Sequence, residues 1–236
     1  MTLGSTLLCQ KHKVVAYIAD GAYSMGGLAD IKSLIGLQNK YGLFLYIDDS
    51  HSLSMFGRLG WGYARTFFSD LNDKTIIVAS LAKAFGASGG LILSGDSQKL
   101  KLIHRYGGPS NWSQSLNAAA IGSGLASIEI HRTSELNMLQ EKLKNNIKLF
   151  DFLIHTDQKS SFSPIRLIRC FESHIANDLS AFLIQHGFFI SPVFFPIVPQ
   201  GMAAVRITLR ADLEKTALEK FCFLVKQKLS DYGLLN

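Results

Sequence analysis

Short apolar runs that end in polar residues, separated by a helical pattern, constrain the fold of this chain most strongly. The runs are "VVAYIAD" (14–20), "LFLYIDD" (43–49), "TIIVASL" (75–81) and the shorter "GLILSG" (90–95). Between the first two, residues 29–41 place apolar side chains at helical spacing. Continuous apolar runs are typical of strands buried on both faces, and their alternation with helices is typical of a parallel sheet. The pattern therefore predicts an α/β domain with a mostly parallel sheet.

The second part of the chain has a different pattern. Residues 127–154 predict one long helix or two abutting helices, and the polar segment 155–164 predicts a boundary loop. Beyond this loop we expect strands near 165–170, 187–191 and 203–209, and helices near 175–186 and 212–230. We therefore divide the chain into a partial large domain, 1–155, and a small α+β domain, 156–236.

The composition suits one or two globular domains, because 47% of the residues are hydrophobic and 18% are charged. The net charge is +6, but the basic residues are scattered, with patches at 11–13 and 142–148. On a helix the second patch is more often a solvated face than a nucleic-acid site, so we expect no nucleic-acid partner. The three cysteines, Cys9, Cys170 and Cys222, have no CxxC spacing and suit free thiols.

Neither a signal peptide nor a membrane-spanning segment is predicted. Residues 1–4 lack the charged start of a signal peptide. The apolar segment 188–198 is too short to cross a bilayer and contains Pro192 and Pro196. We therefore expect a cytoplasmic protein.

Polar side chains follow three of the predicted strands at their C-terminal ends, where open parallel sheets bind ligands. They are Asp20 and Ser24, then Asp48, Asp49 and His51, then Ser80 and Lys83. Each of them alone is more often an ordinary surface, cap or turn residue. Together they suggest a cofactor site, because a desolvated lysine can form a Schiff base and a strand-end carboxylate suits a pyridinium nitrogen. This interpretation expects Lys83 to be shielded from water.

Four motifs occur in a fixed order along most of the chain. They are "DGAYSMGG" (20–27), "YGLFLYIDDSHSLSMFGRLGWG" (41–62), "SLAKAFGASGG" (80–90) and "GMAAVRITL" (201–209). The second is similar to the pattern D-[DE]-[AS]-H-x-x-G-x-x-G-x-x-G-x-G. In this order the motifs resemble those of the α-oxoamine synthases, a family of pyridoxal-phosphate-dependent enzymes related to the class II aminotransferases.

The resemblance implies the large domain of a fold type I pyridoxal-phosphate transferase, with helices on both faces of its sheet, followed by a small domain. Lys83 would hold the cofactor and later move the α-proton of the substrate. Asp48 would pair with the pyridine nitrogen, and His51 would bind the phenolic oxygen or the acyl carbonyl. Asp48 is chosen over Asp49 because it stands three residues before the histidine, and because alternation places the two acids on opposite faces.

The remaining roles implied by the resemblance belong to four serines and one arginine. Ser24 would contact the ring and Ser80 would bind the phosphate. Ser113 and Ser115 would reach the phosphate of the neighbouring subunit in a homodimer with a shared active site. Arg206 would bind the carboxylate of the amino acid, a task that suits a planar guanidinium. No metal is expected.

The implied reaction condenses an amino acid with an acyl-CoA to give an α-amino ketone. The family's N-terminal third, which precedes "DGAYSM", has no counterpart in this sequence, so we expect a C-terminal fragment, a truncated gene product or one half of a split enzyme. Two further departures are "NWSQSLNAAA" (111–120), in place of a T/S-x-S-x-P-P stretch, and Asp30, where proline is common. A non-catalytic partner subunit and an aminotransferase remain as alternatives.

Overall fold

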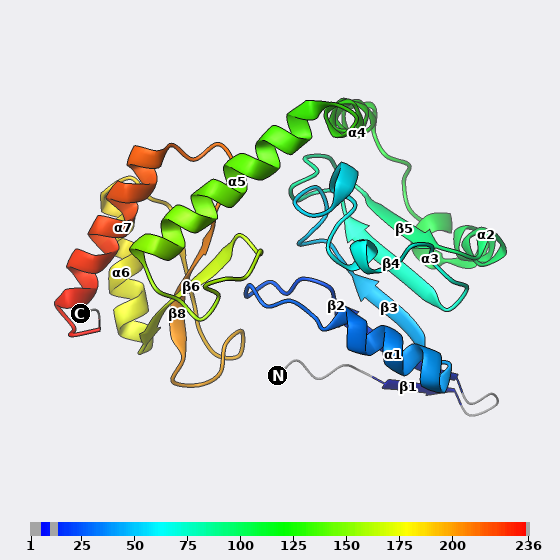
Figure 1. The fold of residues 1–236 in the computed structure, drawn as a ribbon, viewed down its shortest axis with the longest axis horizontal. Helices are drawn as coiled ribbons and strands as arrows, with labels where there is room; N and C mark the ends of the chain where they lie inside the picture. Colours follow the sequence, from blue (N-terminus) through cyan, green and yellow to red (C-terminus); the bar gives the residue numbers. More distant parts are fainter. Residues whose placement is uncertain (1–5, 10–13, 235–236) are drawn as a thin grey trace. The chain divides into compact units, whose positions relative to one another are not determined.

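A computed structural model describes residues 6–9 and 14–234 (Figure 1). The segment 1–4, used above for the signal peptide, and the basic patch 11–13 lie outside the described residues. The chain forms two compact units. The first contains residues up to 23 together with 28–137, and the second contains residues 24–27 together with 138–236.

The first unit contains a five-stranded sheet in the order β1-β2-β3-β4-β5. Its strands are β1 (Thr6–Cys9), β2 (Val14–Asp20), β3 (Phe44–Asp48), β4 (Thr75–Ser80) and β5 (Gly90–Ser94). The pairs β2–β3 and β3–β4 are parallel, whereas β1 and β5 run antiparallel at the two edges (Figure 1). The four predicted strands are confirmed, and the parallel arrangement holds at the centre of the sheet. The edge strand β1 was not predicted.

The strand register places the C-terminal ends of the parallel strands at one level. Asp20 pairs with Asp48 across β2 and β3, and Asp48 pairs with Val78 across β3 and β4. The amide of Gly21 continues this pairing by donating to the Asp48 carbonyl at 2.8 Å. The polar residues that follow these strands therefore begin at the same edge of the sheet.

The helix α1 (Ile31–Tyr41) packs on this sheet through its apolar face. Asp30 caps its first turn by accepting from the Ser33 amide, and Gly42 ends it in a left-handed conformation at φ 69°. Its residues Ile31 and Leu34 share a core cluster with apolar side chains of β3 and β4. The cap also explains why Asp30 is accommodated at this position.

The rest of the first unit is mostly helical. It contains the short 3-10 turns η1 (Arg58–Gly60) and η2 (Ala64–Phe67) and the helices α2 (Ser97–Tyr106), α3 (Gly108–Asn111) and α4 (Ala118–His131). The long helical stretch predicted at 127–154 is two helices, α4 and α5 (Ser134–Leu153), separated at residues 132–133.

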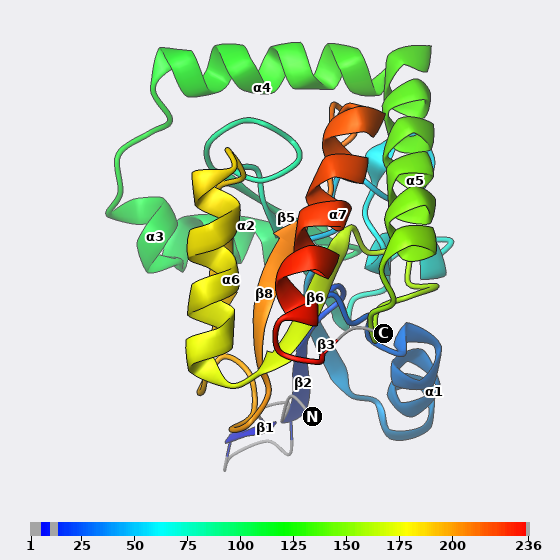
Figure 2. The same ribbon diagram turned by 90° about the vertical axis from the view of Figure 1, so that its left-hand side faces the viewer.

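The second unit contains the predicted small α+β arrangement. Its three strands form an antiparallel sheet in the order β6-β8-β7. The elements after α5 are β6 (Ile165–Phe171), α6 (Ser173–Gln185), β7 (Ser191–Val193), β8 (Ala203–Thr208) and α7 (Lys215–Ser230). Figure 2 shows α6 and α7 beside this sheet. The strand predicted at 187–191 is wrong, because Gly187 turns the chain at φ 89° and pairing begins only at Ser191.

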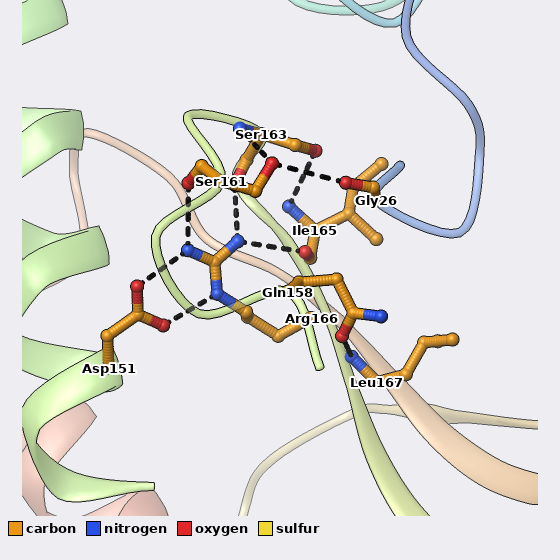
Figure 3. A network of polar contacts seen from close by, with 8 residues as sticks. All are labelled: Gly26, Asp151, Gln158, Ser161, Ser163, Ile165, Arg166 and Leu167. Carbon is orange, nitrogen blue, oxygen red and sulfur yellow. Dashed lines mark hydrogen bonds and ion pairs between the residues drawn. The ribbon is translucent and has the colours of Figure 1, made fainter. Parts of the chain in front are cut away.

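A buried ion pair joins α5 to this sheet (Figure 3). The Arg166 side chain is fully buried, and its Nε and Nη2 donate to the two carboxylate oxygens of Asp151 at 2.7 and 2.8 Å. The same guanidinium donates to the backbone carbonyls of Ser161, Ser163 and Ile165. This network attaches α5 to β6, so α5 packs with the second unit, whereas the division drawn from the sequence at residue 155 groups it with the first.

Two of the three cysteines, Cys170 and Cys222, are free thiols. Cys170 and Cys222 are buried, and burial raises their pKa values to about 11 and about 12. Both are therefore neutral thiols at physiological pH. In the described ranges, no helix has the length and apolar character needed to cross a membrane.

Candidate active site

Lys83 and His51 form the centre of the candidate site. The Nζ atom of Lys83 lies 3.0 Å from Nε2 of His51. Three backbone hydrogen bonds close the loop that carries Lys83, namely Leu81 to Gly89, Ala87 to Leu81 and Gly86 to Lys83. An ammonium group can donate to a neutral imidazole nitrogen, so this contact suits a charged lysine beside a neutral histidine.

The expectation that Lys83 is shielded from water is wrong for the described chain. The side chain of Lys83 is exposed, and His51 is half-buried. Lys83 stands at the tip of its loop, and its described neighbours Ala82 and Ala84 are also exposed. Desolvation of this amine would therefore require a cofactor, a substrate or another polypeptide segment.

Two carboxylates lie at the same edge of the sheet as this pair. Asp20 and Asp48 are register partners at the ends of β2 and β3. Burial, and then the nearby charge of Asp48, raise the pKa of Asp20, while the positive charge of the Lys83–His51 pair acts in the opposite direction. These four titratable groups thus share one electrostatic environment. The sequence placed Asp20 at a strand end but gave it no role, because its partnership with Asp48 depends on the strand register.

Asp49 faces the interior and is enclosed. It is only 1% exposed, and its Oδ2 accepts from the Ala64 amide at 2.8 Å. A Cβ atom at Gly21 or Gly62 would lie 2.4 Å from a carboxylate oxygen of Asp49, so glycine is needed on both sides. Burial raises the pKa of Asp49 to about 6. This enclosure supports the choice of Asp48 as the acid that is available to a ligand.

Ser80 and Ser50 connect the two strand ends. The Ser80 amide donates to Ser50 Oγ at 2.8 Å, and the Ala82 amide donates to Ser80 Oγ at 3.1 Å. The Ser80 hydroxyl therefore shapes the turn that leads from β4 to Lys83. Ser50, which the sequence did not single out, fixes the residues after β3 against the same turn.

Ser113 and Ser115 lie in the exposed segment between α3 and α4. The Ser113 hydroxyl donates to the Pro109 carbonyl. The roles of Ser113 and Ser115 at a phosphate stay predictions.

Arg206 and Ser24 lie together in the second unit. The Nε atom of Arg206 donates to the Ser24 carbonyl at 2.8 Å, so Ser24 contributes its backbone to this contact. Arg206 is half-buried, while its neighbours Val205 and Ile207 are buried, as expected for an alternating strand. Burial lowers the pKa of Arg206 from its usual high value. Its Nε is the atom that contacts Ser24, and the role of Arg206 in binding a substrate stays a prediction.

A groove of about 380 Å³ opens in the first unit. Its wall includes Leu53 and Phe85, which stand two residues after His51 and Lys83 respectively, together with Trp61, Ile128 and His131. The wall is mostly apolar, so the groove suits an apolar group rather than a charged one.

Comparison with known proteins identifies a family and two groups of relatives. Residues 19–223 match the family model of aminotransferase class I and II. An 8-amino-7-oxononanoate synthase of Thermoanaerobacter pseudethanolicus is 30% identical over 214 residues, which are 89% of this chain and 53% of that protein. The mitochondrial 2-amino-3-ketobutyrate coenzyme A ligase of Bos taurus is 26% identical and aligns with 86% of this chain and 48% of its own length. The chain thus spans about half the length of these curated relatives.

A solved structure has the same fold. Serine palmitoyltransferase from S. paucimobilis, determined with PLP and myriocin bound, superposes with a TM-score of 0.83 at 18% identity. The superposition covers 93% of this chain and 56% of the other. This likeness confirms the predicted transferase fold, with a mixed, mostly parallel sheet in the large domain.

Proposed function

Because the chain belongs to the aminotransferase class I and II family, we propose that it is a pyridoxal-phosphate-dependent acyltransferase of the α-oxoamine synthase type. It would condense an amino acid with an acyl-CoA to give an α-amino ketone. The observation that carries this proposal is the contact of 3.0 Å between Lys83 Nζ and His51 Nε2, at the sheet edge where Asp20 and Asp48 are paired. The names of the curated relatives support the same reaction type.

The chemistry of these side chains fits pyridoxal phosphate. The cofactor needs an amine for its aldehyde, a carboxylate for its ring nitrogen and hydrogen-bond donors for its phosphate. Lys83 provides the amine and Asp48 the carboxylate. Ser80 Oγ accepts from the Ala82 amide, so its own hydrogen can be donated to a phosphate oxygen. When bound, the cofactor supplies an electron-withdrawing ring that stabilises negative charge on the substrate.

Lys83, Asp48 and His51 would then have different roles in the reaction. Lys83 would hold the cofactor through Nζ, and its amine would accept the α-proton of the amino acid at the same atom. Asp48 keeps the ring nitrogen protonated through its negative charge. His51 donates a hydrogen bond to the phenolic oxygen of the cofactor or to the acyl carbonyl.

Substrate and subunit contacts extend the proposal. Arg206 would bind the amino-acid carboxylate through its Nη groups, because its Nε is engaged by the Ser24 carbonyl, and Ser24 would adjoin the ring. Ser113 and Ser115, which are exposed, would contact the phosphate held by a partner subunit in a homodimer. We also propose that the protein acts in the cytoplasm.

The exposure of Lys83 supports a second candidate function. In this alternative the chain is a non-catalytic partner subunit that retains the fold. The two candidates differ in whether Lys83 forms a covalent link with the cofactor.

Covalent trapping tests the proposal directly. The purified chain is incubated with excess pyridoxal phosphate and reduced with borohydride, and the modified lysines are identified by peptide mass spectrometry. We expect Lys83 to be the main modified residue, and Lys83→Ala to lose this modification while the control Lys32→Ala, on the exposed face of α1, keeps it. Equal modification of Lys83 and surface lysines would refute the cofactor assignment. Release of CoA thiol in the presence of an amino acid and an acyl-CoA would then distinguish the acyltransferase from an aminotransferase.

A further inference from the structure

The two loops that carry His51 and Lys83 both contact one side chain of α4, His131. Its Nε2 lies 2.9 Å from Ser54 Oγ, in the loop after His51. Its ring packs on the Phe85 ring, in the loop of Lys83, with 5.0 Å between centroids and 39° between planes. We infer that His131 is a positioning residue that holds Lys83 beside His51, an inference that rests on the proposed function for the importance of this pair.

The hydrogen bonds define which nitrogen of His131 carries the proton. Nδ1 lies 2.7 Å from the Ser127 carbonyl, which can only accept, so Nδ1 is the donor. In the neutral ring Nε2 is then an acceptor, and the Ser54 hydroxyl donates to it. The Ser127 hydroxyl, one helical turn earlier, donates to the Phe85 carbonyl at 2.6 Å. One turn of α4 thus binds both loops.

Ser54 supports this inference because its conformation is unfavourable for serine. Its φ is 71°, in the left-handed region that favours glycine, and it occupies the first glycine position of the pattern H-x-x-G that follows His51. A glycine here would be unstrained but could not reach His131. The hydrogen bond to His131 is therefore a contact that a glycine could not make.

Gly60 provides the space for this contact. The Ser54 amide donates to the Gly60 carbonyl at 2.8 Å. A Cβ atom at Gly60 would lie 2.8 Å from both Ser54 Cα and His131 Cδ2. The glycine-containing loop is thus shaped around the imidazole ring.

The consequence concerns the distance between the two reactive nitrogens. Ser54 stands three residues after His51, and Phe85 stands two residues after Lys83. Loss of the His131 ring would remove a side-chain contact from each of these loops at once. The separation of 3.0 Å between Lys83 Nζ and His51 Nε2 should then no longer be maintained.

Nuclear magnetic resonance of the full chain tests this inference without a cofactor. In the wild type we expect a nuclear Overhauser effect between the Lys83 side-chain methylene next to Nζ and the His51 ring protons. His131→Leu should abolish it, whereas His131→Gln, whose amide oxygen can still accept from Ser54, should retain part of it. An unchanged effect in folded His131→Leu, or its absence in the wild type, would overturn the inference. Borohydride trapping at Lys83, measured separately, reports on the proposed function alone.

A matched control is available in the second unit. His186 also has Nδ1 2.8 Å from a carbonyl four residues earlier, that of Phe182, and its ring packs on Phe182 with 4.3 Å between centroids. His186→Leu should leave the contact between Lys83 and His51 intact. A loss as large as that in His131→Leu would indicate a general effect on stability and would overturn the assigned role.

Variants of Ser54 keep the inference testable if His131→Leu fails to fold. Ser54→Ala removes the hydroxyl but retains the strained backbone, so the contact between Lys83 and His51 should weaken. Ser54→Ala should also have no further effect when it is combined with His131→Phe, because the phenyl ring can still pack on Phe85 but offers no acceptor to the Ser54 hydroxyl. Fully additive losses in the double variant would contradict the inference.

Discussion

Asp20 and Asp48 are partners in the register of two parallel strands, and their carboxylates reach the edge of the sheet side by side. Partial burial raises the pKa of Asp20, and the like charge of Asp48 adds to the effect. The positive charge of the Lys83–His51 pair compensates in part, because it favours ionised Asp20. A carboxylate that binds a cofactor nitrogen would therefore have a second acid next to it, whose protonation depends on the occupancy of the site.

The first prediction concerns this coupling. In Asp48→Asn, the pKa of Asp20 should fall toward its ordinary value of 3.8 but stay above it, because burial, the larger cause of the increase, remains. Carboxyl ¹³C shifts measured as a function of pH report the titration of Asp20. The exposed Asp70→Asn serves as control and should leave Asp20 unchanged. An Asp20 titration that is the same in Asp48→Asn and the wild type would contradict the coupling.

The second prediction uses the buried carboxyl of Asp49. Its pKa is raised in the folded state to about 6 from 3.8, so protonation favours folding. This contribution is fully present below about pH 4 and is lost as the pH rises through about 6, at a cost of about 3 kcal/mol in the limit. In Asp49→Asn this pH dependence should disappear, so the stability of the variant relative to the wild type should increase between pH 4.5 and pH 7.5.

Urea unfolding at several pH values measures this effect. The difference in unfolding free energy between Asp49→Asn and the wild type should depend on pH, whereas that for the exposed Asp70→Asn should stay nearly flat. A pH-independent difference for Asp49→Asn would show that the carboxyl titrates alike in the folded and unfolded states.

The sequence predicted the central strands because a strand buried on both faces needs a continuous apolar run. It missed α2, in which none of the residues is buried. The strand predicted at 187–191 rested on three consecutive apolar residues, but Phe189 is 90% exposed and takes no part in the sheet. The sequence pattern therefore predicted the elements whose apolar residues are buried, and it failed for elements whose apolar residues are exposed.

Some features of the candidate site could be predicted from the sequence, and others could not. The grouping of Lys83, His51 and Asp48 at one edge could be predicted, because each lies at or just after the end of a neighbouring strand. The pairing of Asp20 with Asp48 depends on register, and the contact between His131 and Ser54 joins residues 77 positions apart. Neither follows from local spacing. Ser54 did give a signal, since a serine occupies a glycine position of the motif.

The third prediction concerns the buried pair of Arg166 and Asp151. Asp151→Asn should destabilise the protein by about 3–5 kcal/mol, because it leaves an uncompensated guanidinium in the interior. The double variant Arg166→Met/Asp151→Leu should cost less than Asp151→Asn alone. Unfolding in urea measures both. The exposed pair of Arg210 and Asp212 provides a control, and Asp212→Asn should cost less than about 1 kcal/mol. If Asp151→Asn and Asp212→Asn lowered the unfolding free energy by similar amounts, the guanidinium of Arg166 would be compensated by water or by other groups.

The last prediction concerns Arg206. Arg206→Lys should weaken binding of the amino-acid substrate to the chain loaded with pyridoxal phosphate, because an ammonium group cannot form the paired hydrogen bonds of a guanidinium with a carboxylate. Charge-assisted hydrogen bonds contribute about 1.5–3 kcal/mol each, so the loss of one corresponds to a decrease in affinity of roughly tenfold or more. The change in cofactor absorbance on addition of amino acid measures this affinity.

Borohydride trapping at Lys83 should be unaffected, since the cofactor link does not involve Arg206. Arg169→Lys is the control, because Arg169 lies on the same sheet and pairs instead with the exposed Asp157 at 2.9 Å. Equal affinities in the wild type and Arg206→Lys would remove Arg206 from the substrate site and leave its bond to the Ser24 carbonyl as its whole role.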